Sequence, residues 1–322
     1  MNYRKLGRTG FEVSGIGHGL WGMSGWSGSS DQESLAALQL AVDLGCNFYD
    51  TAWAYGEGKS DGLLGEIMAR NPNQRLYAAS KIPPANDRWP ALPEYKYHDV
   101  FSPKHVFKYA DKIRQQLRTD TIDLLQFHVW DDSWTNEPDF RSTVEKLKHD
   151  GWIRYFGLSI NRWQAENGIK ALRTGLVDVV QVIYNIFDQS PEDELFPVCQ
   201  ELNVGVIARV PFDEGSLGGK MTLETRFPKD DWRSGYFGPE NLAKTIKRVD
   251  QLKEILPAGM TLPEMALRFI LSHPAVGTTI AGMRKLDHVR QNIASDSGPL
   301  DKPLLAELKK HRWDRTPQRW SD

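Results

Sequence analysis

Eight short apolar runs recur along the chain, separated by longer segments in which apolar residues follow helical spacing. The runs are apolar throughout, which is typical of strands covered on both faces or closed into a barrel. Eight strands separated by helices favour a (β/α)8 TIM barrel over an open sheet. The predicted strands are Gly15–Trp21, Cys46–Thr51, Leu76–Lys81, Ile122–Val129, Ile153–Ile160, Val177–Asn185, Val204–Val210 and Gly277–Gly282.

Several helix starts can be predicted from local signals. Ser30 and Glu33 form a capping box ahead of an amphipathic stretch that Gly45 ends. Ser102-Pro103 and Ser190-Pro191 each resemble an N-cap followed by proline at the first helical position. A short hairpin-like segment around Leu6–Gly10 precedes the first strand of the predicted barrel.

Three segments are longer than a connection requires: Pro83–Phe101, Pro211–Glu240 and Ser297–Asp322. The first two follow predicted strands, so they leave the carboxyl edge, where the loops of a barrel surround a common mouth. Long ordered loops in compact domains usually have a function. We expect residues 1–322 to form one barrel domain, with the tail at 297–322 over the mouth.

Composition excludes several classes of protein. The chain has 322 residues and a formal net charge of −2, which indicates neither a nucleic-acid nor a membrane-surface partner. It has no apolar run long enough for a membrane span and no apolar N-terminal core typical of a signal peptide. The two cysteines, Cys46 and Cys199, lie in apolar runs, so we expect buried free thiols and a cytoplasmic protein.

One glycine motif is misleading. Gly17–Gly22 matches GxGxxG, the dinucleotide-binding fingerprint, which requires a helix directly after the glycines. The glycine- and serine-rich stretch Met23–Gly28 cannot start that helix. We therefore interpret the motif as a glycine-rich barrel strand and its loop.

Four polar residues stand at or just beyond the ends of predicted strands: Asp50, Tyr55, Lys81 and His128. Reduction of a carbonyl by hydride builds negative charge on the oxygen, so an acid must protonate it. A phenol has an ordinary pKa of about 10 and needs its phenolate stabilised, which the Lys81 ammonium would do. Asp50 would hold that ammonium charged, and His128 would orient the carbonyl oxygen.

Each of these residues alone is more often a hydrogen-bonded structural residue, but their joint placement favours one catalytic site. The histidines are scattered, and none pairs with Cys, His or Glu at ligand spacing, so we predict no metal. The constellation, and the local string Asp50-Thr-Ala-x-x-Tyr55-Gly56, resemble the catalytic tetrad of the aldo-keto reductase family. The resemblance covers nearly the whole chain and implies a nicotinamide cofactor bound through the loops of the carboxyl edge.

The resemblance also implies which residues bind the cofactor. Ser159, Asn161 and Gln181 would contact the nicotinamide amide, although Ile160 interrupts the family's Gly-x-Ser-Asn string. Arg209 stands where relatives often place an aromatic ring against the nicotinamide, unless it pairs with Asp213 or Glu214. The other implied contacts are Trp21 and Gly22 after the first strand, and Pro211, Gly215, Ser216 and Lys220 in the loop over the diphosphate.

The last strand and helix imply NADPH/NADP+ as the cofactor. Gly282, Met283 and Arg284 would bind the 2′-phosphate, while Gln291 and Asn292 would contact the adenine. Two cations, Arg284 and Lys285, before a helix N-terminus suit a phosphate, although they also fit a solvated helix start. We therefore expect NADP over NAD.

The function implied is NADPH-dependent reduction of an aldehyde or ketone, a small-molecule carbonyl substrate. A sugar or alcohol dehydrogenase working in the oxidative direction is the alternative, and a cofactor-binding regulatory subunit of a channel is a weaker one. The sequence separates neither the reaction direction nor the oligomeric state. Candidate walls of the substrate pocket are Trp21, Trp53, Trp89, Trp130 and Trp320.

Overall fold

A closed barrel of eight parallel strands forms the centre of the computed structural model, which describes residues 1–25, 28, 30–229 and 231–315. Each predicted strand run overlaps one barrel strand, with β5 ending one residue later and β10 beginning one residue earlier than predicted, so the predicted (β/α)8 fold is confirmed. The barrel strands are β3 (Ile16–Gly19), β4 (Phe48–Asp50), β5 (Tyr77–Ile82), β6 (Ile122–Phe127), β7 (Ile153–Ser159), β8 (Val179–Ile183), β9 (Gly205–Arg209) and β10 (Val276–Gly282).

The strands pair in chain order from β3 to β9, and β10 closes the ring by pairing with both β9 and β3. Because all the pairs are parallel, every strand ends at the same edge. The residues that follow the eight strands therefore surround one mouth.

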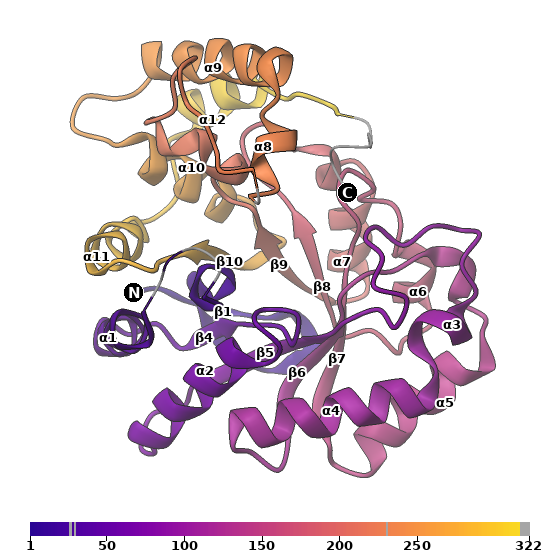
Figure 1. The fold of residues 1–322 in the computed structure, drawn as a ribbon. Coiled ribbons are helices and arrows are strands. Elements are labelled where there is room, and N and C mark those ends of the chain that lie inside the picture. Colours follow the sequence, from indigo (N-terminus) through magenta and orange to yellow (C-terminus); the bar gives the residue numbers. More distant parts are fainter. Residues whose placement is uncertain (26–27, 29, 230, 316–322) are drawn as a thin grey trace.

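Helices cover the outside of the barrel, and α8, α9 and α12 gather beyond one rim (Figure 1). They are α1 (Asp31–Asp43), α2 (Lys59–Arg70), α3 (Tyr97–Phe101), α4 (Pro103–Leu117), α5 (Pro138–His149), α6 (Ile169–Arg173), α7 (Leu195–Glu201), α8 (Arg233–Tyr236), α9 (Pro239–Glu254), α10 (Leu262–Leu271), α11 (Leu286–Ala294) and α12 (Lys302–Lys309). The 3-10 turns are η1 (Gly7–Thr9), η2 (Trp21–Met23), η3 (Asp132–Trp134), η4 (Ser190–Glu192) and η5 (Asp213–Gly218).

Two of the three predicted helix starts are confirmed. The hydroxyl of Ser30 accepts a hydrogen bond from the backbone N–H of Glu33, and Ser102 caps α4 in the same way. The prediction at Ser190-Pro191 is wrong, because this dipeptide forms only the short turn η4 and α7 begins at Leu195. A Ser-Pro signal describes the first turn alone and does not tell whether a helix continues.

The hairpin at the N-terminus consists of β1 (Tyr3–Lys5) and β2 (Glu12–Ser14). Leu6, between these strands, is fully buried against Gly205 and Gly277 at the start of β9 and β10. A Cβ at Gly205 would come within 2.8 Å of the Leu6 side chain, so the glycine makes room for this contact. The hairpin therefore closes the end of the barrel opposite the mouth.

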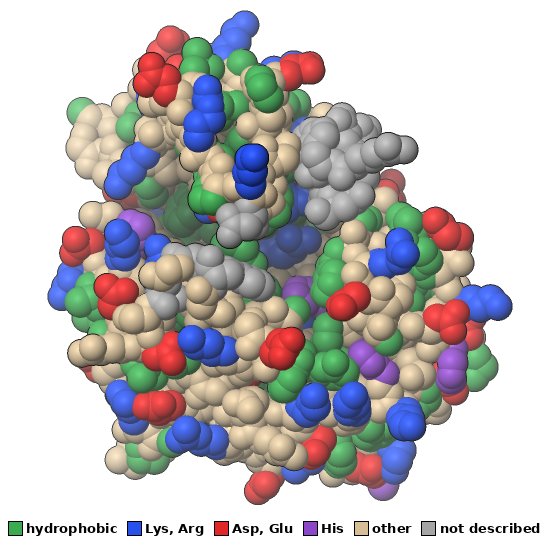
Figure 2. All heavy atoms as spheres, in the orientation of Figure 1, with side chains coloured by type: hydrophobic (Ala, Val, Ile, Leu, Met, Phe, Trp, Pro, Cys, Tyr) green, Lys and Arg blue, Asp and Glu red, His purple; other side chains and the backbone are tan. Residues whose placement is uncertain are grey.

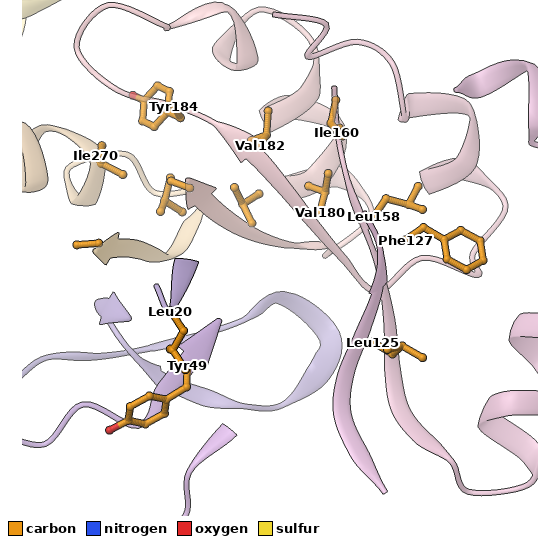
Figure 3. Close-up of a cluster of buried hydrophobic side chains, with 14 of the residues drawn as sticks. Leu20, Tyr49, Leu125, Phe127, Leu158, Ile160, Val180, Val182, Tyr184 and Ile270 are labelled. Atoms are coloured by element: carbon orange, nitrogen blue, oxygen red, sulfur yellow. The ribbon is translucent and has the colours of Figure 1, made fainter. Parts of the chain in front are cut away.

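Buried side chains between the strands and the surrounding helices form the main core, part of which Figure 3 shows. Phe127 of β6 stacks on Phe101 with ring centroids 4.0 Å apart, which fixes α3 and the start of α4 against the barrel. Cys46 and Cys199 are buried free thiols, as expected. This core is apolar on the outer faces of the strands and leaves the mouth for polar residues.

The described part of the C-terminal tail lies against segments that leave the carboxyl edge. The backbone N–H of Trp313 donates to the carbonyl of Phe187, which follows β8. The buried guanidinium of Arg315 pairs with Asp188, which follows β8, and with Asp213, which follows β9. Residues 316–322, including Trp320, lie outside the described residues.

Candidate active site

The four polar residues singled out from the sequence meet at the mouth of the barrel. Asp50 is the last residue of β4, Lys81 is the penultimate residue of β5, and His128 directly follows β6. Tyr55 lies in the tight turns between β4 and α2. Short strands with common ends thus place four residues from three successive β-to-α segments within reach of one another.

Lys81 and Asp50 form an ion pair at the base of the site. The distance from Lys81 Nζ to Asp50 Oδ1 is 2.6 Å, and Nζ also donates to the carbonyl of Thr51 at 2.8 Å. Both side chains are excluded from solvent. Burial lowers the pKa of Lys81, but the charges of Asp50 and Tyr55 together raise it by more than burial lowers it. The pKa is therefore above its ordinary value, and the ammonium stays protonated.

Tyr55 lies above this pair and is only half-buried. Lys81 Nζ is 5.1 Å from the centre of the Tyr55 ring. Burial raises the pKa of Tyr55, and the Lys81 charge offsets only part of that effect, so the pKa is above its ordinary value. The phenol is therefore protonated at neutral pH and can donate its proton.

His128 faces Tyr55 across the mouth. Their ring centroids are 5.7 Å apart at an interplanar angle of 74°, and His128 is also half-buried. Burial and the positive charges of Lys81 and Arg209 hold the pKa of His128 well below its ordinary value. His128 is thus a neutral imidazole, which can donate a hydrogen bond without bringing another charge.

Gln181 connects this group to the far side of the barrel. Its side-chain nitrogen donates to Asp50 Oδ2 at 2.7 Å and approaches Gln126 Oε1 at 3.4 Å, and the residue is 1% exposed. The family resemblance implies that Gln181 contacts the nicotinamide amide. The structure gives it a definite partner, because its amide fixes the second oxygen of Asp50.

Aromatic residues flank the site to different extents. Trp89 is 37% exposed, and its ring lies edge-on to His128 with centroids 5.8 Å apart. Trp21 is 39% exposed on the turn η2 after β3. Figure 2 shows a hollow at this face with Lys, Arg and His side chains at its floor. A separate hollow of about 410 Å³, at the opposite end beside β1 and β2, contains none of the four polar residues.

Two of the predicted wall residues lie elsewhere. Trp130 has no exposed surface and packs on Phe140 and Trp134, so in this structure it belongs to the core and not to a pocket wall. The ring of Trp53 packs edge-on against Tyr109 of α4, with Lys112 above it. The sequence does not indicate whether the ring of a tryptophan near a strand end points toward the mouth or toward the surrounding helices.

Asn161 is engaged differently from the expectation. Its side chain accepts from the backbone N–H of Ala91 at 3.2 Å and donates to the Ala91 carbonyl and to Gln164, each at 2.9 Å. Both amide hydrogens are therefore used, and Asn161 holds the loop after β5 against the end of β7. The expected contact of this nitrogen with a nicotinamide amide would require one of these bonds to break. Ser159 is buried at the end of β7.

Arg209 ends β9 and reaches across the mouth. Its Nη2 donates to the carbonyl of Ile160 at 2.9 Å. The expected alternative, an ion pair with Asp213 or Glu214, is not formed, because Asp213 binds Arg315 and Glu214 binds Arg162 at 2.7 Å. Arg209 therefore keeps its charge beside Tyr55 and His128.

The loop expected over a diphosphate begins at Pro211 and continues as η5. Ser216 is buried and donates to Asp213 Oδ2 at 2.7 Å, so its hydroxyl is already engaged. Glu214 and Gly215 have positive φ angles of 56° and 104°, which turn the backbone sharply at this point. Arg315 holds this turn through Asp213, a contact with no sequence signal because it joins residues about a hundred positions apart.

Cations gather where β10 leads into α11. Burial lowers the pKa of His288, and the charges of Lys220, Lys285 and Arg284 lower it further, whereas Asp287 acts in the opposite direction. Lys285 is the N-cap of α11 and makes no side-chain cap hydrogen bond. Along the same segment Met283 and Asn292 are buried, whereas Gln291 is exposed. His288 was not predicted from the sequence.

The glycines of the mouth leave room for a ligand. A Cβ added to Gly22, Gly218 or Gly282 would meet no atom within 4 Å, so open space borders each of them. Gly22 lies in the turn η2 that follows β3, and Gly282 is the last residue of β10. The open space therefore borders the segment that leads into α11. This space and the adjacent cations fit a dinucleotide with a terminal phosphate near α11.

Comparison with known proteins identifies the family. The model of the Aldo/keto reductase family matches residues 15–312. The chain belongs to this family. It is 29% identical to the uncharacterized oxidoreductase YqkF of Bacillus subtilis (strain 168), over 97% of this chain and 96% of the relative. It is 26% identical to the NADH-specific methylglyoxal reductase of Escherichia coli (strain K12), over 94% and 97% of the two chains.

A solved structure is also similar over its whole length. The glycerol dehydrogenase AKR11B4 from Gluconobacter oxydans superimposes with a TM-score of 0.79 at 26% identity, covering 99% of this chain and 98% of the other. The protein is thus an oxidoreductase of the aldo-keto reductase family, whose members act on small carbonyl compounds with a nicotinamide cofactor. Among the described residues, no helix is long and apolar enough to cross a membrane.

Proposed function

We propose that this protein reduces an aldehyde or ketone to an alcohol with NADPH, and that Tyr55 donates the proton. The observation that supports the proposal most strongly is the fully buried Lys81–Asp50 pair beneath a protonated, half-buried Tyr55 and a neutral His128. A phenol next to an ammonium is an acid whose conjugate base is stabilised where it forms.

A reduced nicotinamide bound at the mouth supplies the hydride. The residues of the chain do the rest: the phenol of Tyr55 gives its proton to the carbonyl oxygen, and the neutral imidazole of His128 donates a hydrogen bond that orients that oxygen. Lys81 stabilises the tyrosinate that remains. Asp50 keeps Lys81 charged, and Gln181 keeps Asp50 in place.

The preference for NADPH is supported by Lys220, Arg284 and Lys285, whose positive charges act on His288 at the start of α11. Three cations near a helix N-terminus without a side-chain cap favour a phosphate, and NADH has no phosphate at the 2′ position. A relative named as NADH-specific keeps the other preference open. Direct titration with both cofactors decides between them.

Other parts of the proposed cofactor site follow the family resemblance. Ser159 and Gln181 would contact the nicotinamide amide, Trp21, Gly22, Pro211, Gly215 and Ser216 would border the diphosphate, and Gly282, Met283, Gln291 and Asn292 the adenosine. Trp21 and Trp89 are the aromatic residues proposed to line the substrate pocket, because both are exposed at the mouth.

The oxidative direction is the second candidate, supported by the similarity to a glycerol dehydrogenase. The same residues serve both directions by microscopic reversibility. The test is a panel of aldehydes, ketones and alcohols assayed through nicotinamide absorbance, with NADPH, NADH and their oxidised forms. The proposal expects the highest kcat/KM for carbonyl reduction with NADPH, and the absence of carbonyl reduction with either reduced cofactor would overturn it.

A further inference from the structure

Arg209 forms no ion pair with a carboxylate of the described residues, and Glu214 and Asp50 act on its charge only from a distance. Its Nη2 donates to the carbonyl of Ile160, while Nε is buried without a partner. The acidic residues of the adjacent loop are engaged elsewhere, since Glu214 binds Arg162 and Asp213 binds Arg315. Among the described residues, the guanidinium of Arg209 thus lacks both a carboxylate ion pair and a hydrogen-bond acceptor for Nε.

The charge lies at the reacting centre. The pKa of Arg209 is lowered to about 10, first by burial and then by Arg162, while the charges of Glu214, Tyr55 and Asp50 act against this shift. The guanidinium therefore remains charged at neutral pH. Asp50 is paired with Lys81 at 2.6 Å and forms no ion pair with Arg209.

The proposed contents of the site do not neutralise Arg209 either. The ring of a reduced nicotinamide is uncharged, and the phosphates are proposed to lie along η5 and α11. A buried cation without a counter-ion is unfavourable, and a planar guanidinium matches the two oxygens of a carboxylate. A carboxylate on the molecule that is reduced would supply a counter-ion at this point.

We propose that Arg209 binds a carboxylate of the substrate, so that the enzyme prefers aldehydes or ketones that also carry a carboxylate. The inference rests on the proposed function, because it concerns the substrate of the same site. It names a class of substrate and assigns Arg209 as the residue that selects it.

The test compares two substrates that share the same ring and aldehyde and differ by a negative charge and one methyl group: 4-carboxybenzaldehyde and methyl 4-formylbenzoate. We expect the wild-type kcat/KM for the carboxylate to exceed that for the ester by roughly ten- to a hundredfold, the range of a charge-assisted hydrogen bond. In Arg209→Gln this ratio should fall to about one. The ratio is the readout because the substitution also alters the surroundings of Tyr55 and so affects both substrates.

Arg226 provides a matched control, since it is an exposed arginine on the same long segment after β9. Arg226→Gln should keep the wild-type ratio, and Arg209→Lys should keep part of it. A measurement independent of turnover is calorimetric binding of 4-(hydroxymethyl)benzoate to the enzyme with bound cofactor. Its Kd should rise about tenfold or more in Arg209→Gln, whereas binding of the methyl ester should be unchanged.

Three results would overturn the inference. A wild-type ratio near one shows that the site does not select a carboxylate. An unchanged ratio in Arg209→Gln, with altered affinity for NADPH or NADP+, assigns Arg209 to the cofactor instead. If the wild type reduces neither aldehyde with either cofactor, the proposed function is wrong as well. If it reduces the ester as fast as the carboxylate, only the inference about Arg209 is wrong.

Discussion

The side-chain amide of Gln181, on β8, donates to Asp50 Oδ2 at 2.7 Å, while Lys81 donates to Oδ1 of the same carboxylate. Asp50 is therefore held from both sides of the barrel interior. These two bonds fix the carboxylate beside Lys81, and the charge of Asp50 helps to raise the pKa of the Lys81 ammonium beneath Tyr55. The catalytic group thus depends on a strand on the far side of the barrel.

Replacement of Gln181 by Met should weaken this arrangement at nearly constant side-chain size. Asp50 Oδ2 would lose its donor, so the free energy of unfolding should fall by about 1 to 3 kcal/mol and kcat should fall with it. Urea denaturation and steady-state kinetics measure the two effects. Gln126→Met is the matched control, because the Gln126 Nε2 has no partner among the described residues and its loss should cost less. Equal losses for both variants would contradict the assigned role of Gln181.

The strands and the four polar residues could be predicted from the sequence because both depend on local signals. Apolar runs define the strands, and parallel strands bring their ends to one edge, so Asp50, Lys81 and His128 had to converge once the barrel was assumed. The helix starts at Ser30 and Ser102 were predicted correctly for the same reason, because a helix cap involves residues only three positions apart.

The features that could not be predicted are contacts between distant segments. Asn161 fits a nicotinamide string, but its side chain binds Ala91, 70 positions away. Trp130 stands near a strand end, yet it is enclosed by α5. Arg315 holds Asp188 and Asp213 through packing that no local pattern encodes. Side-chain direction and long-range ion pairs therefore had to come from the structure.

The proposed NADPH preference predicts a selective effect at Arg284. Arg284→Ala should weaken NADPH binding by about 1.5 to 3 kcal/mol, because a charge-assisted hydrogen bond to the 2′-phosphate is lost. NADH binding should change little. Fluorescence quenching with both cofactors measures the difference, and equal losses for NADPH and NADH would show that Arg284 acts structurally.

Asp61 predicts a pH dependence of stability. Its carboxyl is fully buried on α2, accepts from Ser80 at 2.7 Å, and has a pKa that burial raises from 3.8 to about 7. The pKa of Asp61 is about 7 in the folded protein and 3.8 in the unfolded chain. Its protonated carboxyl therefore contributes its full stabilisation below pH 3.8, and this contribution is lost as the pH rises through 7. Asp61→Asn cannot titrate, so its unfolding free energy relative to wild type should increase by about 2 to 3 kcal/mol between pH 5 and pH 8. A constant difference in urea denaturation would contradict the raised pKa.

The two reaction directions should respond differently to pH. Tyr55 has a raised pKa and His128 a lowered one, so between pH 6 and pH 8 the phenol stays protonated and the imidazole stays neutral. Carbonyl reduction should be nearly constant over this range. Alcohol oxidation requires the phenolate as a base, so its kcat/KM should rise with pH by up to about tenfold per unit. Reduction that declines as the pH rises through 7 would exclude Tyr55 as the titrating acid.

The most direct test of the account is single-turnover reduction of an aldehyde by Tyr55→Phe with bound NADPH. The substitution removes the hydroxyl and preserves the ring, so the hydride-transfer rate should fall by about two to four orders of magnitude while NADPH affinity is unchanged. Tyr109→Phe, a half-buried tyrosine packed on Trp53, should react at the wild-type rate. A Tyr55→Phe rate within a few-fold of wild type would contradict the assignment of Tyr55 as the proton donor.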